Sequence, residues 1–406
     1  MSHAESGLKL AYVVPRYGTE IIGGAENATR MLSEALVRLG RAQVEILTTT
    51  ALSMDTWANH FPAGTETING VTVHRFKVDG ERAPNFAAAT RRALAAPAAR
   101  SMEEAAELIR MQGPVSHGLL EAIATRDYDA VLFYPYLYHP TVEGVRLAKA
   151  PTVMHPAAHD EPVIDLPIFE SVFATVSGFA YHTAAEREVV ESRFQVAEKP
   201  SIDLGMGFEP HQGAAGGYLR EIGIEGRPFL LCLGRVDAPK GTTLLVDLFR
   251  EYKERNPSEL QLVVAGPIYI APNPAPDVHV VGAVSEAAKE ELLSECSALV
   301  SPSAFESFAI VLLEAWAKQK PVLVNSVCAA TSEQVQRSGG GLRFDGFETF
   351  EAALNILTRD SSAAAALGAA GRRYAMSRYH WPDLVDRYVA FLRRVIAAEE
   401  RRKSLS

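Results

Sequence analysis

The chain has 406 residues, of which 48% are hydrophobic and 22% charged, and its formal net charge is −9. This length allows two domains with a core each, while the acidic balance argues against nucleic acid as a partner, because the nucleic-acid backbone requires a basic surface. The three cysteines, Cys232, Cys296 and Cys328, have no paired spacing, which excludes a disulfide framework or zinc knuckle and indicates a reducing compartment.

The first half of the chain alternates strand-length apolar runs with helical patterns, which is typical of parallel α/β architecture. No run approaches the ~18 apolar residues of a membrane span, and the first run contains Lys9, so we expect a cytoplasmic protein without a signal peptide. The predicted helices are Glu26–Leu39 and a long alanine-rich one over Phe86–Met111. The predicted strands are Leu8–Val14, Val44–Thr49, Val71–Phe76, Ala130–Tyr134 and Thr152–His155.

A glycine pair, Gly23 and Gly24, directly precedes the first predicted helix. Glycines at this place let the backbone approach a ligand closely, while the helix N-terminus faces that ligand. The alternative is an ordinary turn. A dinucleotide fingerprint is not indicated, because the pattern G-x-G-x-x-G is missing.

Two polar groups in the first half invite a metal interpretation. Asp127 and Asp129 form a D-x-D pattern, but they directly precede a predicted strand, so we interpret them as polar residues at its start. His155 ends another predicted strand, and His159 follows with an Asp-Glu pair after it. No regular helical spacing supports a metal there, and we predict neither a metal nor a cofactor.

The segment Gly205–Tyr218 is rich in glycine, lacks apolar periodicity and is interpreted as a linker. After it the alternation restarts, which predicts a second α/β unit and ligand binding at the carboxyl ends of the two sheets. We place the domains at 1–210 and 211–378, with a final helix over 379–406. The predicted strands are Phe229–Leu233, Leu262–Ala265, His279–Val281, Leu299–Ser301 and Val322–Asn325.

Two loops of the second half carry charged residues suited to a nucleotide. Arg235 and Lys240 lie in a glycine-bounded loop after a strand and can converge on one diphosphate; the alternative is two solvated cations. In Ser301–Val322 a strand, a tight loop and a buried helix follow one another, so the helix N-terminus can face an anion. Glu306 lies in that loop, and Glu314 lies two turns into the helix, where an unpaired carboxylate among apolar residues is costly.

These motifs, in this order, resemble those of retaining glycosyltransferases of family 4 (glycosyl transferases group 1). Such enzymes have the GT-B fold, with two Rossmann-like α/β domains facing each other across a cleft. The resemblance implies that a glycine-pair loop closes over the donor phosphates or the acceptor, and that the last helix returns to the N-terminal domain. It implies donor binding by Gly23, Gly24, Arg235, Lys240, Glu306, Phe308, Ala309, Ile310 and Glu314.

The activity that the resemblance implies is transfer of a sugar, with retention, from a UDP- or GDP-linked donor to an unknown hydroxyl acceptor in glycan, glycolipid or natural-product glycoside synthesis. A histidine at a strand end contacts the donor sugar in this family; His155 matches by position, and His159 is its competitor. The catalytic residues would be His155, Arg235, Lys240 and Glu306, without a metal. The alternatives are a nucleotide-sugar epimerase or hydrolase and a non-catalytic nucleotide-sugar-binding subunit.

The chain departs from the family pattern where glycine is usual. Ala309 and Gln319 each replace a glycine, and Cys328-Ala329-Ala330 replaces a glycine pair. Because alanine is compatible with a helix, we expect Ala309 to present its N–H as a helical residue would. The arginines of Phe86–Met111 suggest membrane contact, but nearby glutamates and the net charge oppose it, so we expect at most weak peripheral association.

Overall fold

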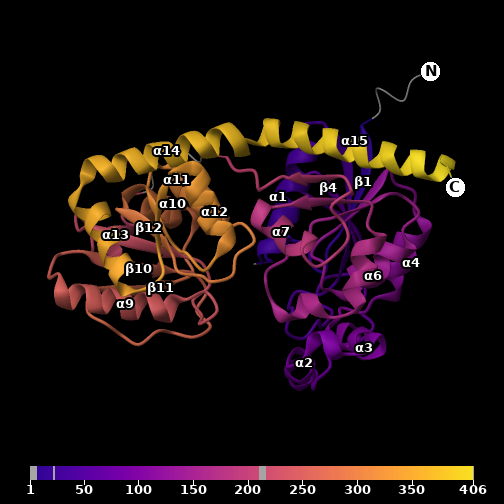
Figure 1. Cartoon of the computed structure of the whole chain (residues 1–406), viewed down its shortest axis with the longest axis horizontal. Coiled ribbons are helices and arrows are strands. Elements are labelled where there is room, and N and C mark those ends of the chain that lie inside the picture. The colour runs from indigo at the N-terminus through magenta and orange to yellow at the C-terminus, as the bar shows by residue number, and fades with distance from the viewer. Residues whose placement is uncertain (1–6, 22, 210–215, 406) are drawn as a thin grey trace. The chain divides into compact units, whose positions relative to one another are not determined.

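The structure is a computed structural model that describes residues 7–21, 23–209 and 216–405. It divides into two compact units (Figure 1). Unit 1 comprises Met1–Gly207 and Trp381–Ser406, and unit 2 comprises Phe208–His380. The domain limits expected at 210 and 378 lie close to these boundaries. Of the predicted linker, residues 210–215 lie outside the described residues.

Unit 1 is built on an eight-stranded sheet with the order β3-β4-β2-β1-β5-β6-β7-β8. Neighbouring strands are parallel, except that β3 is antiparallel to β4. The strands predicted in this half are confirmed within two residues at each end, whereas β3, β7 and β8 are additional. The bounds are β1 Leu8–Val13, β2 Ala42–Thr49, β3 Gly64–Ile68, β4 Val71–Phe76, β5 Ala130–Phe133, β6 Thr152–Met154, β7 Gly178–Tyr181 and β8 Ser201–Asp203.

The helices of unit 1 differ from expectation in one place. The single helix predicted over 86–111 is wrong, because Pro97 interrupts it: proline has no N–H to donate and its ring clashes with the preceding turn. A new helix starts after Ser101, which forms a capping box with Glu104. The helices are α1 Gly24–Arg38, α2 Phe86–Leu94, α3 Met102–Gln112, α4 His117–Thr125, α5 His139–Leu147, α6 Ile168–Thr175 and α7 Ala184–Glu191, with short 3-10 turns η1 Pro97–Ala99 and η2 Pro162–Asp165.

The C-terminal helix, α15 (Trp381–Leu405), belongs to unit 1, as the resemblance implied. It contacts α1 and β8. Its apolar stripe faces the interior, with Leu384, Val385, Tyr388, Phe391, Leu392 and Val395 all buried. Burying such a stripe is the main source of stability for a helix of this kind.

Unit 2 has a six-stranded parallel sheet with the order β11-β10-β9-β12-β13-β14. Its inner strands are buried on both faces, which explains why they appear as continuous apolar runs. The strands are β9 Phe229–Leu233, β10 Gln261–Ala265, β11 Val278–Gly282, β12 Ala298–Ser301, β13 Val322–Asn325 and β14 Gly341–Phe344. The helices are α8 Tyr218–Glu221, α9 Thr242–Arg255, α10 Glu286–Glu295, α11 Ile310–Ala317, α12 Ala329–Ser338, α13 Phe347–Arg359 and α14 Ser361–Tyr379.

Candidate functional site

The carboxyl edge of the unit 2 sheet collects the charged loops that the sequence singles out. The loops after β9 and β12 lie next to each other there, because these two strands are hydrogen-bonded neighbours. In an open parallel sheet this edge is where ligands bind. The site is therefore built from loops of one unit, on strands whose register is fixed by the core.

The loop after β9 is organised by Asp237, which sequence reasoning missed. Its carboxylate accepts a hydrogen bond from the backbone N–H of Lys240 (2.8 Å), and its carbonyl accepts one from the Thr242 hydroxyl (2.9 Å). The Nε of Arg235 lies 3.5 Å from the same carboxylate. An aspartate three residues before the lysine is a signal for such a local turn.

Gly241 lets this loop pack against the end of β12. Its φ is +73°, and a Cβ there would lie 2.6 Å from the carbonyl oxygen of Pro302. A larger residue would be strained and would push the two loops apart. The glycine therefore brings Lys240 within reach of the β12 loop.

Lys240 and Glu306 form an ion pair, with Nζ 2.6 Å from Oε1. Their side chains are 27% and 18% exposed, so the pair is accessible without being fully solvated. Arg235 contacts Asp237 instead, so each of the two predicted cations of the loop faces a carboxylate. The site thus offers both cationic donors for phosphate and a carboxylate that accepts from hydroxyl groups.

An aromatic residue that the sequence did not indicate lies beside Arg235. Tyr269, in the segment after β10, is 67% exposed, and its ring centroid is 5.9 Å from the Arg235 guanidinium carbon. The backbone N–H of Tyr269 donates to the carbonyl of Val236 (3.0 Å), which joins the loops after β9 and β10. An exposed ring held by the backbone adds apolar contact area to the edge of the site.

The corner between β12 and α11 corrects one expectation. Ala309 is not helical: it is the residue before α11 and has a left-handed φ of +60°. Gln319, which follows α11, is also left-handed, with φ +58°. These are the two positions at which the family usually has glycine, and glycine adopts this conformation without strain.

Phe308, predicted to bind the donor, turns its side chain into the interior of unit 2. It is buried, its ring meets that of Tyr379 at 5.3 Å, and its carbonyl accepts a hydrogen bond from the Gln334 amide. Its side chain therefore anchors the corner from inside. Ile310 begins α11, so the first N–H groups of this helix follow Ala309 directly.

Glu314, on α11, has an ion-pair partner that its sequence context does not indicate. The Nζ of Lys289, from α10, is 3.2 Å from its carboxylate. Burial alone would lower the pKa of Lys289, but the charges of Glu314 and Glu286 outweigh burial and raise this pKa. Glu314 is therefore not an unpaired carboxylate, because the fold supplies a cation.

A thiol lies under the charged pair. Cys232, on β9, is buried, and burial together with the charge of Glu306 raises its pKa to about 12. The thiol therefore stays protonated at neutral pH and is not a nucleophile.

The glycine pair lies at the start of α1, with Gly23 directly before the helix and Gly24 as its first residue. The carboxylate of Glu26 lies against Gly23, where a Cβ would come 2.2 Å from it. Arg16 fixes this carboxylate through two hydrogen bonds of 2.5 and 2.9 Å. A carboxylate at this helix start favours hydroxyl groups over phosphate as ligands.

His155, predicted to contact the donor sugar, is 3% exposed inside unit 1. Its Nε2 lies 2.6 Å from the hydroxyl of Tyr388 on α15, and burial together with the neighbouring His182 lowers its pKa to about 3. The cavity beside it measures about 10 Å³, which suffices for no more than one water. This arrangement disagrees with a sugar contact and indicates that His155 holds α15. The competing residue, His159, is half-buried.

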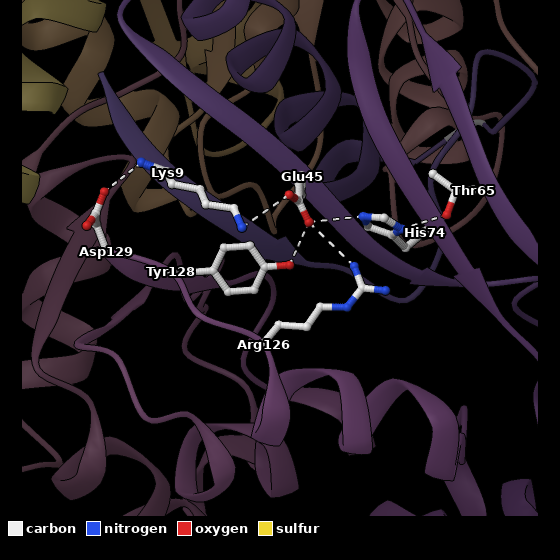
Figure 2. A network of polar contacts seen from close by, with 7 residues as sticks. All are labelled: Lys9, Glu45, Thr65, His74, Arg126, Tyr128 and Asp129. Atoms are coloured by element: carbon white, nitrogen blue, oxygen red, sulfur yellow. Dashed lines mark hydrogen bonds and ion pairs between the residues drawn. The ribbon is translucent and has the colours of Figure 1, made fainter. Parts of the chain in front are cut away.

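Asp129, the second aspartate of the D-x-D pattern, forms part of a structural network (Figure 2). The carboxylate of Asp129 accepts a hydrogen bond from the backbone N–H of Lys9 (2.7 Å), and the Tyr128 hydroxyl donates to Glu45 (2.7 Å). The network lies at the start of β1, at the end of the sheet opposite the carboxyl edge. In the part of the chain that the structure describes, no group of three or more His, Cys, Asp or Glu residues could hold a metal ion.

Comparison with known proteins agrees with this architecture. Residues 219–374 match the family described as glycosyl transferases group 1. The alpha-maltose-1-phosphate synthase of Mycobacterium tuberculosis is 27% identical over 221 residues, which cover 48% of this chain and 56% of that protein. A GDP-mannose-dependent alpha-(1-6)-phosphatidylinositol monomannoside mannosyltransferase of the same organism is 26% identical over 274 residues, covering 61% and 71%. The chain thus spans little more than half the length of the first relative.

Solved structures resemble almost the whole chain. The alpha,alpha-trehalose 6-phosphate synthase of Burkholderia multivorans has a TM-score of 0.70 at 14% identity and covers 97% of this chain and 100% of its own. HepE of Anabaena, solved with UDP and glucose, has a TM-score of 0.66 at 14% identity, covering 95% and 100%. Within the described residues, no helix is long and apolar enough to cross a membrane. Residues 219–374 thus match the model of the glycosyl transferases group 1, and the two α/β units have the GT-B fold.

Proposed function

We propose that the chain is a glycosyltransferase that moves a sugar from a UDP- or GDP-linked donor to a hydroxyl group of an acceptor. The observation that carries this proposal is the pairing of Lys240 with Glu306 at the carboxyl edge of the unit 2 sheet. A cation for the diphosphate and a carboxylate for sugar hydroxyls then lie side by side. The names of relatives support this class of donor: one is GDP-mannose-dependent, and HepE was solved with UDP and glucose.

In the proposed reaction, the bond between the anomeric carbon and the diphosphate oxygen breaks, and the acceptor oxygen bonds to the same face, with retention. Arg235, Lys240 and the N–H groups of Ala309–Ile310 stabilise the negative charge that builds on the departing diphosphate. The departing phosphate oxygen takes the proton of the acceptor hydroxyl. Because the two cations offset this charge, we propose that no metal is required, and a chelator should leave turnover unchanged.

Two further assignments belong to this proposal. For the sugar-contacting histidine we propose His159, because it lies in the segment after β6 and is half-buried, whereas His155 is enclosed. Three buried free cysteines, Cys232, Cys296 and Cys328, support a reducing compartment, and we propose that the protein works in the cytoplasm in glycan, glycolipid or natural-product glycoside synthesis.

Calorimetry with UDP and GDP tests the proposal, followed by assays of UDP-glucose and GDP-mannose with and without candidate hydroxyl acceptors. The wild type should bind at least one nucleotide, and Lys240→Met should bind it more weakly. Arg220→Met, on α8, is the matched control, because this exposed arginine pairs with Glu225 outside the edge loops. Rapid hydrolysis or epimerisation of the donor alone would indicate the alternative enzyme classes. Failure to bind any nucleoside diphosphate at millimolar concentration would overturn the proposal.

A further inference from the structure

Arg82, in the segment after β4, holds a half-buried guanidinium without a carboxylate partner. Among the described residues, none gives its side chain a hydrogen bond or an ion pair, and its Nε is buried with no hydrogen-bond partner. Only its backbone N–H is satisfied, by the carbonyl of Thr56 at 2.7 Å. Burying part of a charged donor without a partner is unfavourable. Within the described residues, the Arg82 guanidinium therefore has donors left to bind a further group.

Arg82 and three of its neighbours come from the segments that follow four adjacent strands. Arg16 follows β1, Trp57 follows β2, Arg82 follows β4 and Tyr138 follows β5. These strands are consecutive in the sheet order β4-β2-β1-β5, and all are parallel. Their carboxyl ends therefore meet at one edge, which is where an open parallel sheet binds its ligand.

Two aromatic rings hold the guanidinium of Arg82 in place. Its central carbon lies 5.2 Å from the ring centroid of Trp57 and 4.9 Å from that of Phe86. Trp57 is itself fixed, because its Nε1 donates to the Gln112 carbonyl (2.5 Å) and its ring meets that of Tyr138 at 5.6 Å. Contact with rings uses the face of the guanidinium and satisfies none of its five N–H donors. The Nε is enclosed, whereas the donors of the two terminal nitrogens are held in position and remain available.

The surrounding charges leave Arg82 uncompensated. The nearby guanidinium of Arg16 is neutralised by Glu26 at 2.5 Å. Burial lowers the pKa of Arg82, and the charge of Arg16 lowers it further. Tyr138 and Asp55 raise this pKa, but it stays below its ordinary value. Among the described residues, Glu26 pairs with Arg16 and Asp55 acts on Arg82 without forming an ion pair, so this region can accept an additional negative charge.

We propose that Arg82 binds an anionic group, phosphate or carboxylate, on the acceptor molecule, with Trp57 and Phe86 holding its fork of N–H donors toward that group. The assignment of this anion to the acceptor rests on the proposed function, whereas the anion site itself is independent of it. A planar guanidinium fits either oxyanion through two parallel hydrogen bonds, which lysine cannot reproduce. The acceptor would then be a charged molecule, not a neutral sugar.

Titration calorimetry at constant ionic strength tests this inference, with inorganic phosphate, glucose 6-phosphate, glucuronate and glucose as probes. The wild type should bind phosphate and at least one of the two charged sugars. It should bind glucose at least about tenfold more weakly, because glucose lacks the group that makes the charge-assisted contact. Preference for glucose 6-phosphate over glucuronate identifies phosphate as the group, and the reverse preference identifies carboxylate. If the wild type binds none of the anions, the inference is wrong.

The variants separate this site from the donor site. Arg82→Met should weaken anion binding at least about tenfold, Arg82→Lys should retain part of it, and Arg91→Met, an exposed arginine of α2, should bind as the wild type does. A merely structural role predicts that both Arg82 variants lower the Tm without changing the dissociation constant, which would overturn the inference. Lys240→Met should lose nucleotide affinity and keep the Arg82-dependent anion site. If nucleotides fail to bind while this anion site persists, the proposed function falls and the site stands.

Discussion

The Nζ of Lys240 lies 2.6 Å from Oε1 of Glu306, although 66 positions separate the two residues in the chain. This ion pair joins the loop after β9 to the loop after β12. Because the pair is partly exposed, a bound diphosphate can compete with Glu306 for Lys240, while the sugar offers its hydroxyl groups to Glu306. A site of this kind is held together before the ligand arrives.

Replacing either cation of the β9 loop should reduce activity. Lys240→Met and Arg235→Met each remove a charge-assisted contact to the diphosphate, of about 1.5–3 kcal/mol, which corresponds to roughly ten- to a hundredfold in kcat/KM. Steady-state kinetics with the donor identified by the binding panel measures the effect. Arg220→Met should remain at the wild-type level. Full activity and full nucleotide affinity in both loop variants would contradict the assignment of a phosphate clamp.

The two glutamates should separate in their effects. Glu306→Gln is expected to lower kcat with little change in affinity for the free nucleotide, because Glu306 is assigned to the sugar. Glu314→Gln is expected to weaken binding of the free nucleotide by about 1.5–3 kcal/mol, because Glu314 is assigned to ribose hydroxyls. Calorimetry with UDP or GDP distinguishes them.

A control is needed for Glu314, since the substitution also breaks its pair with Lys289. Lys289→Met breaks the same pair but leaves the carboxylate for the ribose. If both variants lose nucleotide affinity equally, the effect comes from the ion pair, and the ribose role of Glu314 is wrong.

Ten of the fourteen strands in the described residues were predictable, because most are buried on both faces and appear as uninterrupted apolar runs, whereas β3, β7, β8 and β14 were missed. The strand β3, with the sequence Gly-Thr-Glu-Thr-Ile, gave no such signal, since it is an antiparallel edge strand with mostly exposed residues. The break at Pro97 was foreseeable from the residue type alone. A continuous helix is nevertheless what the high alanine content on both sides of this single proline indicates.

The charged loops of unit 2 were likewise foreseeable, because they follow predicted strands that pair in one sheet. Partners from distant segments were not. The hydroxyl that bonds His155 belongs to Tyr388, 233 positions away, and the cation beside Glu314 comes from another helix. Strand-end position predicts where a backbone points. It does not predict which later element covers the side chain.

Glycine at the two left-handed positions that flank α11 should stabilise unit 2. Ala309→Gly and Gln319→Gly each relieve the steric cost of a side chain at positive φ, which is about 1–2 kcal/mol. Glycine also gives the unfolded chain more conformational freedom, which lowers stability by about 0.4–1 kcal/mol. We expect a net gain of about 0.5–1 kcal/mol for each variant, measured as a rise in Tm or in the denaturant midpoint. Ala315→Gly, in the middle of α11, is the matched control and should destabilise. Equal losses in all three variants would show that neither position is strained.

The stability of unit 1 should pass through a maximum near pH 6.5. Burial is the main cause that lowers the pKa of His155 to about 3 and of His182 to about 4, and it raises the pKa of Glu186 to about 8. Both histidines bind protons in the unfolded chain before they do so in the fold, so their stabilisation is complete above pH ~6.5 and is lost as the pH falls. Glu186 acts oppositely: its stabilisation is complete below pH ~4.5 and is lost as the pH rises toward 8.

Among these three groups, two histidines therefore oppose one carboxyl group between pH 4.5 and 6.5, and together they contribute a rise of about 1.4 kcal/mol per pH unit to the free energy of unfolding. His182→Gln should flatten this slope, Glu186→Gln should roughly double it, and His117→Gln, whose imidazole is 83% exposed, should leave it unchanged. Hydrogen exchange of peptides from β6 and β7, corrected for the intrinsic effect of pH, reports on unit 1 alone. A wild-type slope that persists in His182→Gln would show that this histidine is not held neutral by its burial. A slope that His117→Gln removes would place the titrating group at the surface instead.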